Sequence, residues 1–439
     1  MAELPTPPRN CARASACLAV ALLVASPADA VAAENAALSP QPAGSAVPRA
    51  VLDLEEAIAM ASGEQPAIAA FEREAVASDE AAIAARSLPD LRLLVGIQNF
   101  PITGDNAFSP TEDFMTMYMV GVMREQVRRS KREADAARIR AEALVSRRQA
   151  SAQERRIRRD VMIVWIDGVE ARAKQTLLAR LIADLRTGRK VIEASIPTGG
   201  STPSLALQAQ SQIALQQAQL ADAERAEARA RAELARWIGP AASLPLPASI
   251  PDIEPPTAAM RGLLPAHPEL LVAQAEQEAA VRGVDVARQQ RERDVSWQIS
   301  LGLRPEFGHM VSAQVSVPLQ LNRRNRQDRL VAEAQARAQA AGLRLEDTRR
   351  DLLRRFSVAA ADYAGAEAEL GRINQDAIPS LESAFKAAEA RYAGGGGTLE
   401  QPFEIIRDYV ELTIQSLETR AKRARAAAEM IYIAGEAGR

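Results

Sequence analysis

Residues 295–304 read VSWQISLGLR, a stretch in which apolar side chains alternate with polar or small ones without a break. Successive side chains of a β-strand point to opposite faces, so this segment predicts a strand with one apolar and one polar face. Its length is also about what a tilted strand needs to cross a lipid bilayer. Half-buried strands of soluble sheets alternate in the same way, so the segment needs partner strands before it indicates a membrane.

Three further segments are expected to be strands: 91–99, 114–123 and 310–319. The first and last of these alternate as 295–304 does, whereas FMTMYMVGVM at 114–123 is apolar on both faces and fits the pattern less well. If the strands cross a membrane, one face meets lipid. The side chains expected on that face are Leu93, Val95, Ile97, Val295, Trp297, Ile299, Leu301, Val315 and Val317.

The composition indicates long helices for most of the chain. Among its 439 residues, 54 basic side chains nearly balance 56 acidic ones, so the total charge does not suggest a nucleic-acid partner. Aromatic residues make up only 4%, while Ala, Glu, Arg, Gln and Leu are abundant, as in helices packed on one another. The Arg-rich stretch 124–159 is interspersed with acidic residues, which favours a solvated helical face over a nucleic-acid site.

The N-terminus is typical of a secretory signal peptide. Arg9 and Arg13 precede the apolar run 16–25, and Ala28 and Ala30 supply the small residues of a cleavage site. We expect a signal peptide at 1–30 and a linker at 31–50. Both cysteines of the chain lie in the segment expected to be removed. No later stretch has 18 consecutive apolar residues, so any membrane segment is expected to be made of strands.

The rest of the chain contains an internal duplication. Arg128 in VGVMREQVRRSKRE aligns with Arg323 in VSVPLQLNRRNRQD, an offset of 195 residues. Gly199 in PTGGST aligns with Gly395 in AGGGGT, an offset of 196 residues. A nearly constant offset over this distance predicts two structural repeats of the same layout.

Repeat 1 is expected at 51–242 and repeat 2 at 257–439, joined by the Pro-rich linker 243–256. Each repeat is predicted to contain a helix, a strand hairpin, a long helix, a Gly-rich turn and a final helix. The expected ranges are 54–86, 91–123, 124–194, a tip near 195–203 and 203–237 in repeat 1, and 257–291, 295–319, 322–391, a tip near 392–398 and 399–433 in repeat 2.

Geometry then constrains how four such strands can enter a membrane. A helix of ~70 residues spans ~105 Å, which matches two helices of about 35 residues placed end to end. Four strands cannot close a barrel, and open edges are costly in lipid. A mainly α protein with a small β part would therefore have to share its strands. A trimer would form a 12-stranded β-barrel, continued by a periplasmic α-helical barrel.

The layout and the tip sequence RYAGGGGTLEQPFEII (391–406) resemble the TolC-like outer-membrane efflux proteins. Within that family, GIQNFP followed by GVMREQVRRSKREADAARIRAEA is similar to the heavy-metal branch, although Ser130 stands where that branch has a glycine before Lys131. The resemblance implies a homotrimer in the outer membrane, extending into the periplasm, that conducts substrate passively. It also implies a periplasmic adaptor (membrane fusion protein) and an RND-type inner-membrane pump as partners, and heavy-metal cations as cargo.

The same resemblance implies a gate at the periplasmic tip. The family's tip has a Tyr-x-x-Gly pattern, and carboxylates commonly follow its glycine by six and nine residues. Those carboxylates would form a ring that selects cations or holds the gate closed; the alternative is a solvated helix face. The residues of this chain at or beside those positions are Tyr392, Gly395, Gly199, Glu400, Gln401 and Glu404.

Other functions remain open or are not expected. Drug efflux and type I protein secretion are alternative roles for such a duct. A periplasmic coiled-coil adaptor or a structural filament protein are alternatives of another class. No nucleophile, acid–base pair or metal-ligand spacing indicates an enzyme, a cofactor or a metal site. The only histidines are His267, near an expected helix start, and His309, in an expected hairpin loop, so a shared metal site is not expected. Met115, Met117 and Met119 share one strand face; thioethers suit Cu(I), but apolar packing is the usual role of Met.

Overall fold

The computed structural model describes residues 51–63, 65–197, 201–255, 264–304, 307–394 and 400–434. The chain separates into a unit Met1–Arg49 and a unit Ala50–Arg439, and all described residues belong to the second. The expected signal peptide, the linker after it, Gly199 and Gly395 lie outside the described residues.

The first half of this unit contains four α-helices and two strands: α1 Leu54–Ala61, α2 Pro66–Arg86, β1 Arg92–Gln98, β2 Met117–Gln126, α3 Arg129–Ser195 and α4 Pro203–Ile238. The prediction of a single helix at 54–86 is wrong, because the helix is interrupted between Ala61 and Pro66. Gly63 and Pro66 explain the break: glycine weakens a helix, whereas proline is tolerated in its first turn. A 3-10 turn, η1 Gly239–Ser243, follows α4.

The second half repeats this order: η3 Leu264–Ala266, α5 Pro268–Gln290, β3 Val295–Leu303, β4 Met310–Ser316, α6 Gln327–Arg372, the π turn η4 Ile373–Ala377, α7 Ile378–Ala393 and α8 Glu400–Ala434. The helix expected from 257 instead begins at Pro268, capped by the side chain of His267. The long helix begins at Gln327, not at 322, and is interrupted by a π turn for which the sequence gives no signal.

The four strands form one antiparallel sheet in the order β1-β2-β3-β4. The central pair, β2 with β3, joins the two halves of the unit, since Gln126 lies opposite Val295 and Tyr118 lies opposite Leu303. β2 ends later than expected, at Gln126, so α3 begins at Arg129 instead of at 124. The expected fold class, mainly helical with a small sheet, is confirmed.

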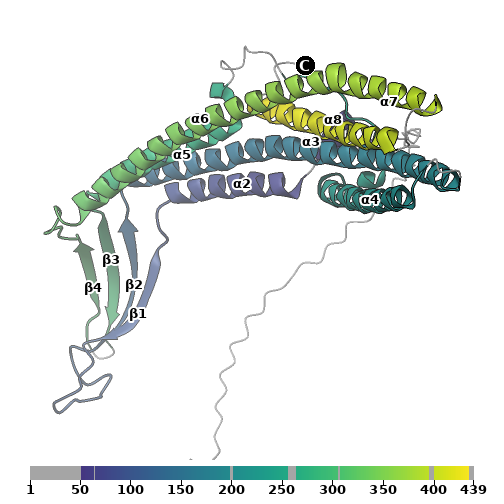
Figure 1. Cartoon of the computed structure of the whole chain (residues 1–439). Helices are drawn as coiled ribbons and strands as arrows, with labels where there is room; N and C mark the ends of the chain where they lie inside the picture. The colour runs from purple at the N-terminus through teal and green to yellow at the C-terminus, as the bar shows by residue number, and fades with distance from the viewer. Residues whose placement is uncertain are drawn as a thin grey trace, which may run out of the picture. The chain divides into compact units, whose positions relative to one another are not determined.

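The helices lie side by side and the strands leave them at one end (Figure 1). α3 has 67 residues, a length of about 100 Å, and contacts α2 and α4, which follow one another along it. α6 in the same way contacts α5 and α8, and α3 contacts α5 and α8 across the two halves. The hairpin connections β1–β2 and β3–β4 lie at the far end of the sheet from the helices.

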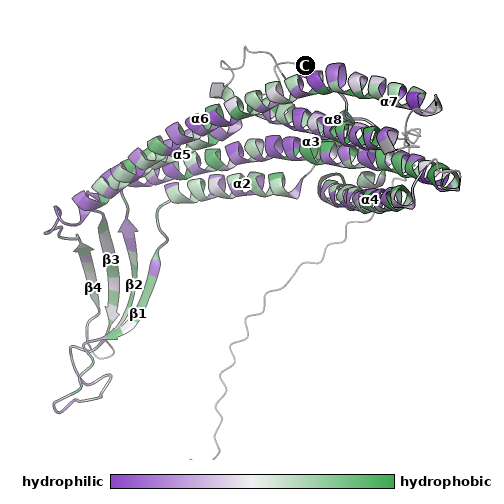
Figure 2. Ribbon diagram, viewed as in Figure 1, coloured by the Kyte–Doolittle hydropathy of each residue, from purple (hydrophilic) through white to green (hydrophobic). Residues whose placement is uncertain are grey.

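The main core lies where α1, α3, α4 and α8 meet. Trp165 of α3 is fully buried there, and its indole N–H donates to the carbonyl oxygen of Leu52 at 3.1 Å. Many other buried positions are alanines, which let long helices approach closely. Hydrophilic and hydrophobic residues are interspersed along the helices (Figure 2), as expected for a thin helical layer that is polar where it is not packed.

Candidate functional site

One face of the sheet is apolar across all four strands. Paired residues of neighbouring strands share a face, and the register places Val95 opposite Val120, Val120 opposite Leu301 and Leu301 opposite Val311. Leu93, Val95 and Val311 are 70%, 72% and 74% exposed, so this chain does not cover the face. Its members are Leu93, Val95, Ile97, Tyr118, Val120, Val122, Val295, Trp297, Ile299, Leu301, Leu303, Val311, Ala313 and Val315, and Val317 follows directly after β4.

The opposite face carries mainly serine, glutamine, glycine and methionine, with Arg92 and Glu125 towards the helices and Leu94 of β1 as its one branched aliphatic side chain. The register explains the segment 114–123, which fitted the alternating pattern poorly in the sequence. Tyr118, Val120 and Val122 join the apolar face, whereas Met117 and Met119 join the polar one. The apolar appearance of both faces of β2 therefore comes from methionine on the polar side, and β2 is two-faced like its neighbours. The polar neighbours are Gln98, Ser296, Gln298, Ser300, Ser312, Gln314 and Ser316.

The sheet has two open edges. In the described part of the chain, β1 pairs with β2 and β4 pairs with β3, and neither has a strand on its other side. Each edge strand presents a row of backbone N–H and C=O groups to a further strand. Within the described residues, the sheet therefore has an uncovered apolar face and two unpaired edges.

A carboxylate fixes the start of α3 to the start of β3. The backbone N–H of Arg128 donates to Asp294 Oδ1 at 3.1 Å, and the ammonium of Lys131 pairs with Asp294 Oδ2. The guanidinium of Arg128 also pairs with Glu292. The Asp294 side chain is only 10% exposed, so it is a largely buried tie between the two repeats. This tie contains Lys131, the residue after the Ser130 that departs from the heavy-metal pattern.

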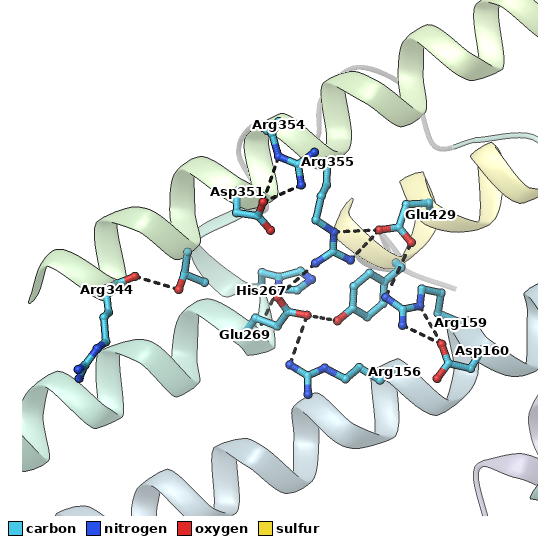
Figure 3. A network of polar contacts seen from close by, with 12 residues as sticks. Arg156, Arg159, Asp160, His267, Glu269, Arg344, Asp351, Arg354, Arg355 and Glu429 are labelled. Carbon is cyan, nitrogen blue, oxygen red and sulfur yellow. Dashed lines mark hydrogen bonds and ion pairs between the residues drawn. The ribbon is translucent and has the colours of Figure 1, made fainter. Parts of the chain in front are cut away.

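A second group of charges joins four helices in the middle of the layer (Figure 3). Arg355 of α6 donates to Glu429 of α8 at 2.6 Å and to Glu269 of α5 at 3.4 Å. The hydroxyl of Tyr432 donates to Glu269, and the guanidinium of Arg159 of α3 lies 4.6 Å from the centre of the Tyr432 ring. This network was not predicted from the sequence, because its members are far apart in the chain and show no motif.

Burial shapes the protonation of this network. Burial and the hydrogen bond to Glu269 raise the pKa of Tyr432 to about 12. Burial, aided by the positive charge of Arg155, lowers the pKa of His267 to about 4. His267 is 1% exposed and its Nδ1 accepts the backbone N–H of Glu269 at 3.2 Å. At neutral pH His267 is therefore uncharged and acts as a cap for α5.

The expected tip residues lie where α7 ends and α8 begins. Tyr392 is half-buried in the last turn of α7, and Gln401 and Glu404 are exposed in the first turns of α8. Gln401 and Glu404 are three residues apart, hence on one side of the helix. Glu400 is the first residue of α8, with its side chain outside the described part, as are Gly395 and Gly199. The described residues of this set therefore lie near one another at the α7–α8 connection, but the single chain does not show a gate.

The described residues contain no helix that is long and apolar enough to cross a membrane. Among the same residues, no group of three or more His, Cys, Asp or Glu side chains is placed to hold a metal ion.

Comparisons with known proteins bear on the fold. No protein-family model and no curated protein sequence matches the chain. Solved structures do match. The structure of CusC, described for its folding and transmembrane channel formation, has a TM-score of 0.74 and 15% sequence identity to this chain. The match covers 87% of this chain and 92% of CusC. VceC, an outer-membrane protein of Vibrio cholerae, matches at 19% identity, 87% and 96% coverage and a TM-score of 0.71. The outer-membrane channel CmeC of Campylobacter jejuni matches at 12% identity, 87% and 85% coverage and a TM-score of 0.72.

The chain has the fold of these outer-membrane channels. The match to CusC covers 87% of this chain, so it extends over most of the described helices and strands. At these identities the likeness shows the fold alone.

Proposed function

We propose that the chain is the outer-membrane exit duct of a tripartite, RND-type efflux system, a TolC-like protein that conducts substrate passively to the exterior. The observation that carries the proposal is the sheet: one exposed apolar face, one polar face and two open edges, on a chain with the fold of outer-membrane channels. A lipid-facing apolar band with a polar interior is the arrangement of transmembrane barrels.

The open edges define how the duct closes. β1 and β2 are antiparallel, as are β3 and β4, so β1 and β4 run in opposite directions. The β4 edge of one protomer can therefore pair with the β1 edge of the next in an antiparallel ladder, as in a cyclic assembly. Three protomers supply twelve strands, an even number in the range of membrane barrels. The exposed residues Leu93, Val95, Ile97, Val295, Ile299, Leu301, Val315 and Val317, together with half-buried Trp297, then face lipid.

The helices extend the duct into the periplasm. α3 and the continuous α6–η4–α7 run lead away from the sheet for about 100 Å. The tip at α7–α8, with Glu404 and its neighbours, is the place for the gate and for docking a periplasmic adaptor, which in turn contacts an inner-membrane pump. Heavy-metal cations are the cargo we favour, because of the resemblance around 96–101 and 121–143. Organic drugs and secreted proteins are the alternatives.

The test of the duct is localisation followed by conductance. Full-length protein, produced with its leader in a bacterium with two membranes, is expected in the outer-membrane fraction. After detergent extraction, light scattering should give the mass of three chains, and planar bilayers should show steady single-channel currents. Recovery in the soluble periplasmic fraction would instead support an adaptor or a filament protein and would overturn the proposal.

The test of the cargo is a gene deletion in the natural host with plasmid rescue. Growth inhibition by cobalt, zinc, cadmium and copper is measured beside a panel of dyes and antibiotics. Rescued sensitivity to metals alone supports metal cargo. Unchanged metal tolerance with rescued sensitivity to organic compounds would retain the duct and reject the metal.

A further inference from the structure

Methionine is concentrated on the polar face of the sheet. Four of the ten methionines of the chain lie there: Met117, Met119 and Met123 of β2 and Met310 of β4. Every Val, Ile and Leu of β2, β3 and β4 lies on the other face. If the methionines served apolar packing alone, branched aliphatic residues would be expected among them. The two faces of these strands thus separate thioethers from hydrocarbons.

Three of these methionines surround one glycine. Met119 of β2 lies opposite Gly302 of β3, and Gly302 lies opposite Met310 of β4. The residue between Met119 and Met310 therefore has no side chain of its own. Met117 covers the same spot: a Cβ added to Gly302 would lie 2.6 Å from the sulfur of Met117. The sulfur occupies the space that any other residue at 302 would fill.

The surroundings leave this cluster open on its outer side. On β1, Gly96 lies opposite Met119, and a Cβ added there would meet nothing within 4 Å. Met310 is 45% exposed, whereas Met117 is 9% exposed over Gly302. Met117 is therefore the buried member of the cluster, and Met310 is accessible to solvent. The cluster's paired neighbours on this face are the neutral side chains Gln98, Ser300 and Ser312. The nearest charge along β3 is Arg304, whose guanidinium donates to the carbonyl oxygens of Gly308 and Phe114.

We propose that Met117, Met119 and Met310 form a binding site for a soft monovalent metal cation, Cu(I) or Ag(I). Thioether sulfur is a soft, uncharged ligand that favours Cu(I) over harder ions. Harder divalent cations favour imidazole, carboxylate or water ligands, and none of the paired strand residues around the cluster is acidic or a histidine. His309, which precedes Met310, accepts the backbone N–H of Arg304 with its Nδ1 at 3.4 Å. Uncharged ligands hold a cation less tightly than thiolates, so the bound ion exchanges with the solution.

The site adds a feature to the proposed duct. The statement that the cluster faces the lumen rests on the proposed function, whereas the binding of the ion does not. On the polar face of a closed barrel, three protomers would place three such clusters at one level of the wall. A soft cation would there exchange its water ligands for sulfur as it passes.

The test is silver binding to the purified full-length protein in detergent. Ag(I) is used because it is stable in air, and the buffer is free of chloride and thiols. Calorimetric titration is expected to give about one tight equivalent per chain. The variant Met117→Leu/Met119→Leu/Met310→Leu should bind Ag(I) about tenfold more weakly or worse, because Leu keeps the volume but removes the sulfur. The control Met60→Leu/Met123→Leu/Met430→Leu removes the same number of sulfurs and should bind as the wild type.

A second variant tests the geometry without removing any sulfur. Gly302→Ala adds a methyl group where the Met117 sulfur lies and should weaken Ag(I) binding several-fold, because the Met117 side chain has to move. A circular dichroism spectrum like that of the wild type shows that the fold is kept. X-ray absorption of the Cu(I)-loaded wild type should show sulfur as the nearest neighbours. Binding that is equal in all variants, equal loss in the control triple, or nitrogen and oxygen neighbours would each overturn the site.

Conductance separates this proposal from the duct. Bilayer recordings in potassium nitrate should give the same single-channel current for the wild type and for the triple Leu variant. If the wild type forms no channel but the triple Leu variant still binds Ag(I) more weakly than the wild type, the proposed duct is refuted and the proposed metal site is supported. If channels form and Ag(I) binding is unaffected by the variants, the duct stands and the site fails.

Discussion

Arg355 of α6 donates to Glu429 of α8 at 2.6 Å, and both side chains are about three-quarters buried. The same guanidinium reaches Glu269 of α5 at 3.4 Å, so one cation holds two carboxylates from two other helices. We expect Arg355→Met to lower the free energy of unfolding by about 1–3 kcal/mol, because both carboxylates lose a partner in a partly dry site. Thermal unfolding followed by circular dichroism measures the loss.

Arg350→Met is the matched control on the same helix. Arg350 pairs with Glu346 one turn away on an exposed surface, so its loss should change the free energy by less than about 0.5 kcal/mol. Equal melting temperatures for the two variants would show that the buried network does not stabilise the helix layer.

His267 makes stability depend on pH in the mildly acidic range. Its pKa falls from 6.5 to about 4 on folding, mainly because burial disfavours the charged ring. Between these two values the unfolded chain binds a proton that the folded chain does not, so stability falls as the pH is lowered from 6.5 towards 4. The contribution lost across this window is about 3 kcal/mol.

The variant His267→Asn isolates that contribution, because Asn caps a helix but does not titrate. Melting temperatures are measured from pH 7 to pH 4.5 for both proteins. The wild type should lose more stability on acidification than the variant. Parallel curves would mean that His267 does not titrate in this window, and that carboxylates elsewhere cause the acid sensitivity.

Neighbouring residues of β4 distinguish the two faces of the sheet. Val315 lies on the exposed apolar face, and Gln314 lies on the polar one. A lysine on the lipid face of a membrane barrel costs up to about 2–4 kcal/mol, whereas a lysine in the interior costs little. Val315→Lys should therefore reduce the amount of trimer in the outer-membrane fraction, and Gln314→Lys should leave it unchanged. An equal yield of both variants would refute the proposed lipid face.

The tip prediction concerns Glu404, exposed near the start of α8. If its carboxylates form a ring in the lumen, Glu404→Gln should reduce the preference of the channel for cations. The reversal potential under a potassium chloride gradient measures that preference. Glu382→Gln, at an exposed position of α7, is the control and should have no effect. A reversal potential unchanged by Glu404→Gln would place this residue on a solvated outer face.

The sequence predicted much of the sheet and little of its chemistry. Strict alternation at 295–303 identified β3 with its observed bounds, because the period of two is a direct property of a strand. It could not predict that Met119 and Met310 flank Gly302, because register depends on pairing between strands. The network around Arg355 was also out of reach, since its members come from four helices and share no spacing.

The offset between the two repeats is not constant along the chain. The offset between the repeats grows from 195 residues at Arg128 and Arg323 to 196 at Gly199 and Gly395. In that interval the second repeat contains the π turn η4, and one wide turn accommodates one extra residue without changing the phase of the helix beyond it. Asn374 of this turn accepts a hydrogen bond from Ser416 of α8 at 3.1 Å. The π turn is thus one position in the packed layer that can accommodate a one-residue insertion.

The two open edges of the sheet also constrain how the protein is made. A single protomer with its strands already formed would expose both β1 and β4, together with the apolar side chains of one entire face, to water. Such a species would add strands from any neighbouring chain and aggregate. We therefore expect the sheet to form only where lipid and further strands are present to cover it. In the proposed duct, folding of the sheet, insertion and assembly become a single step.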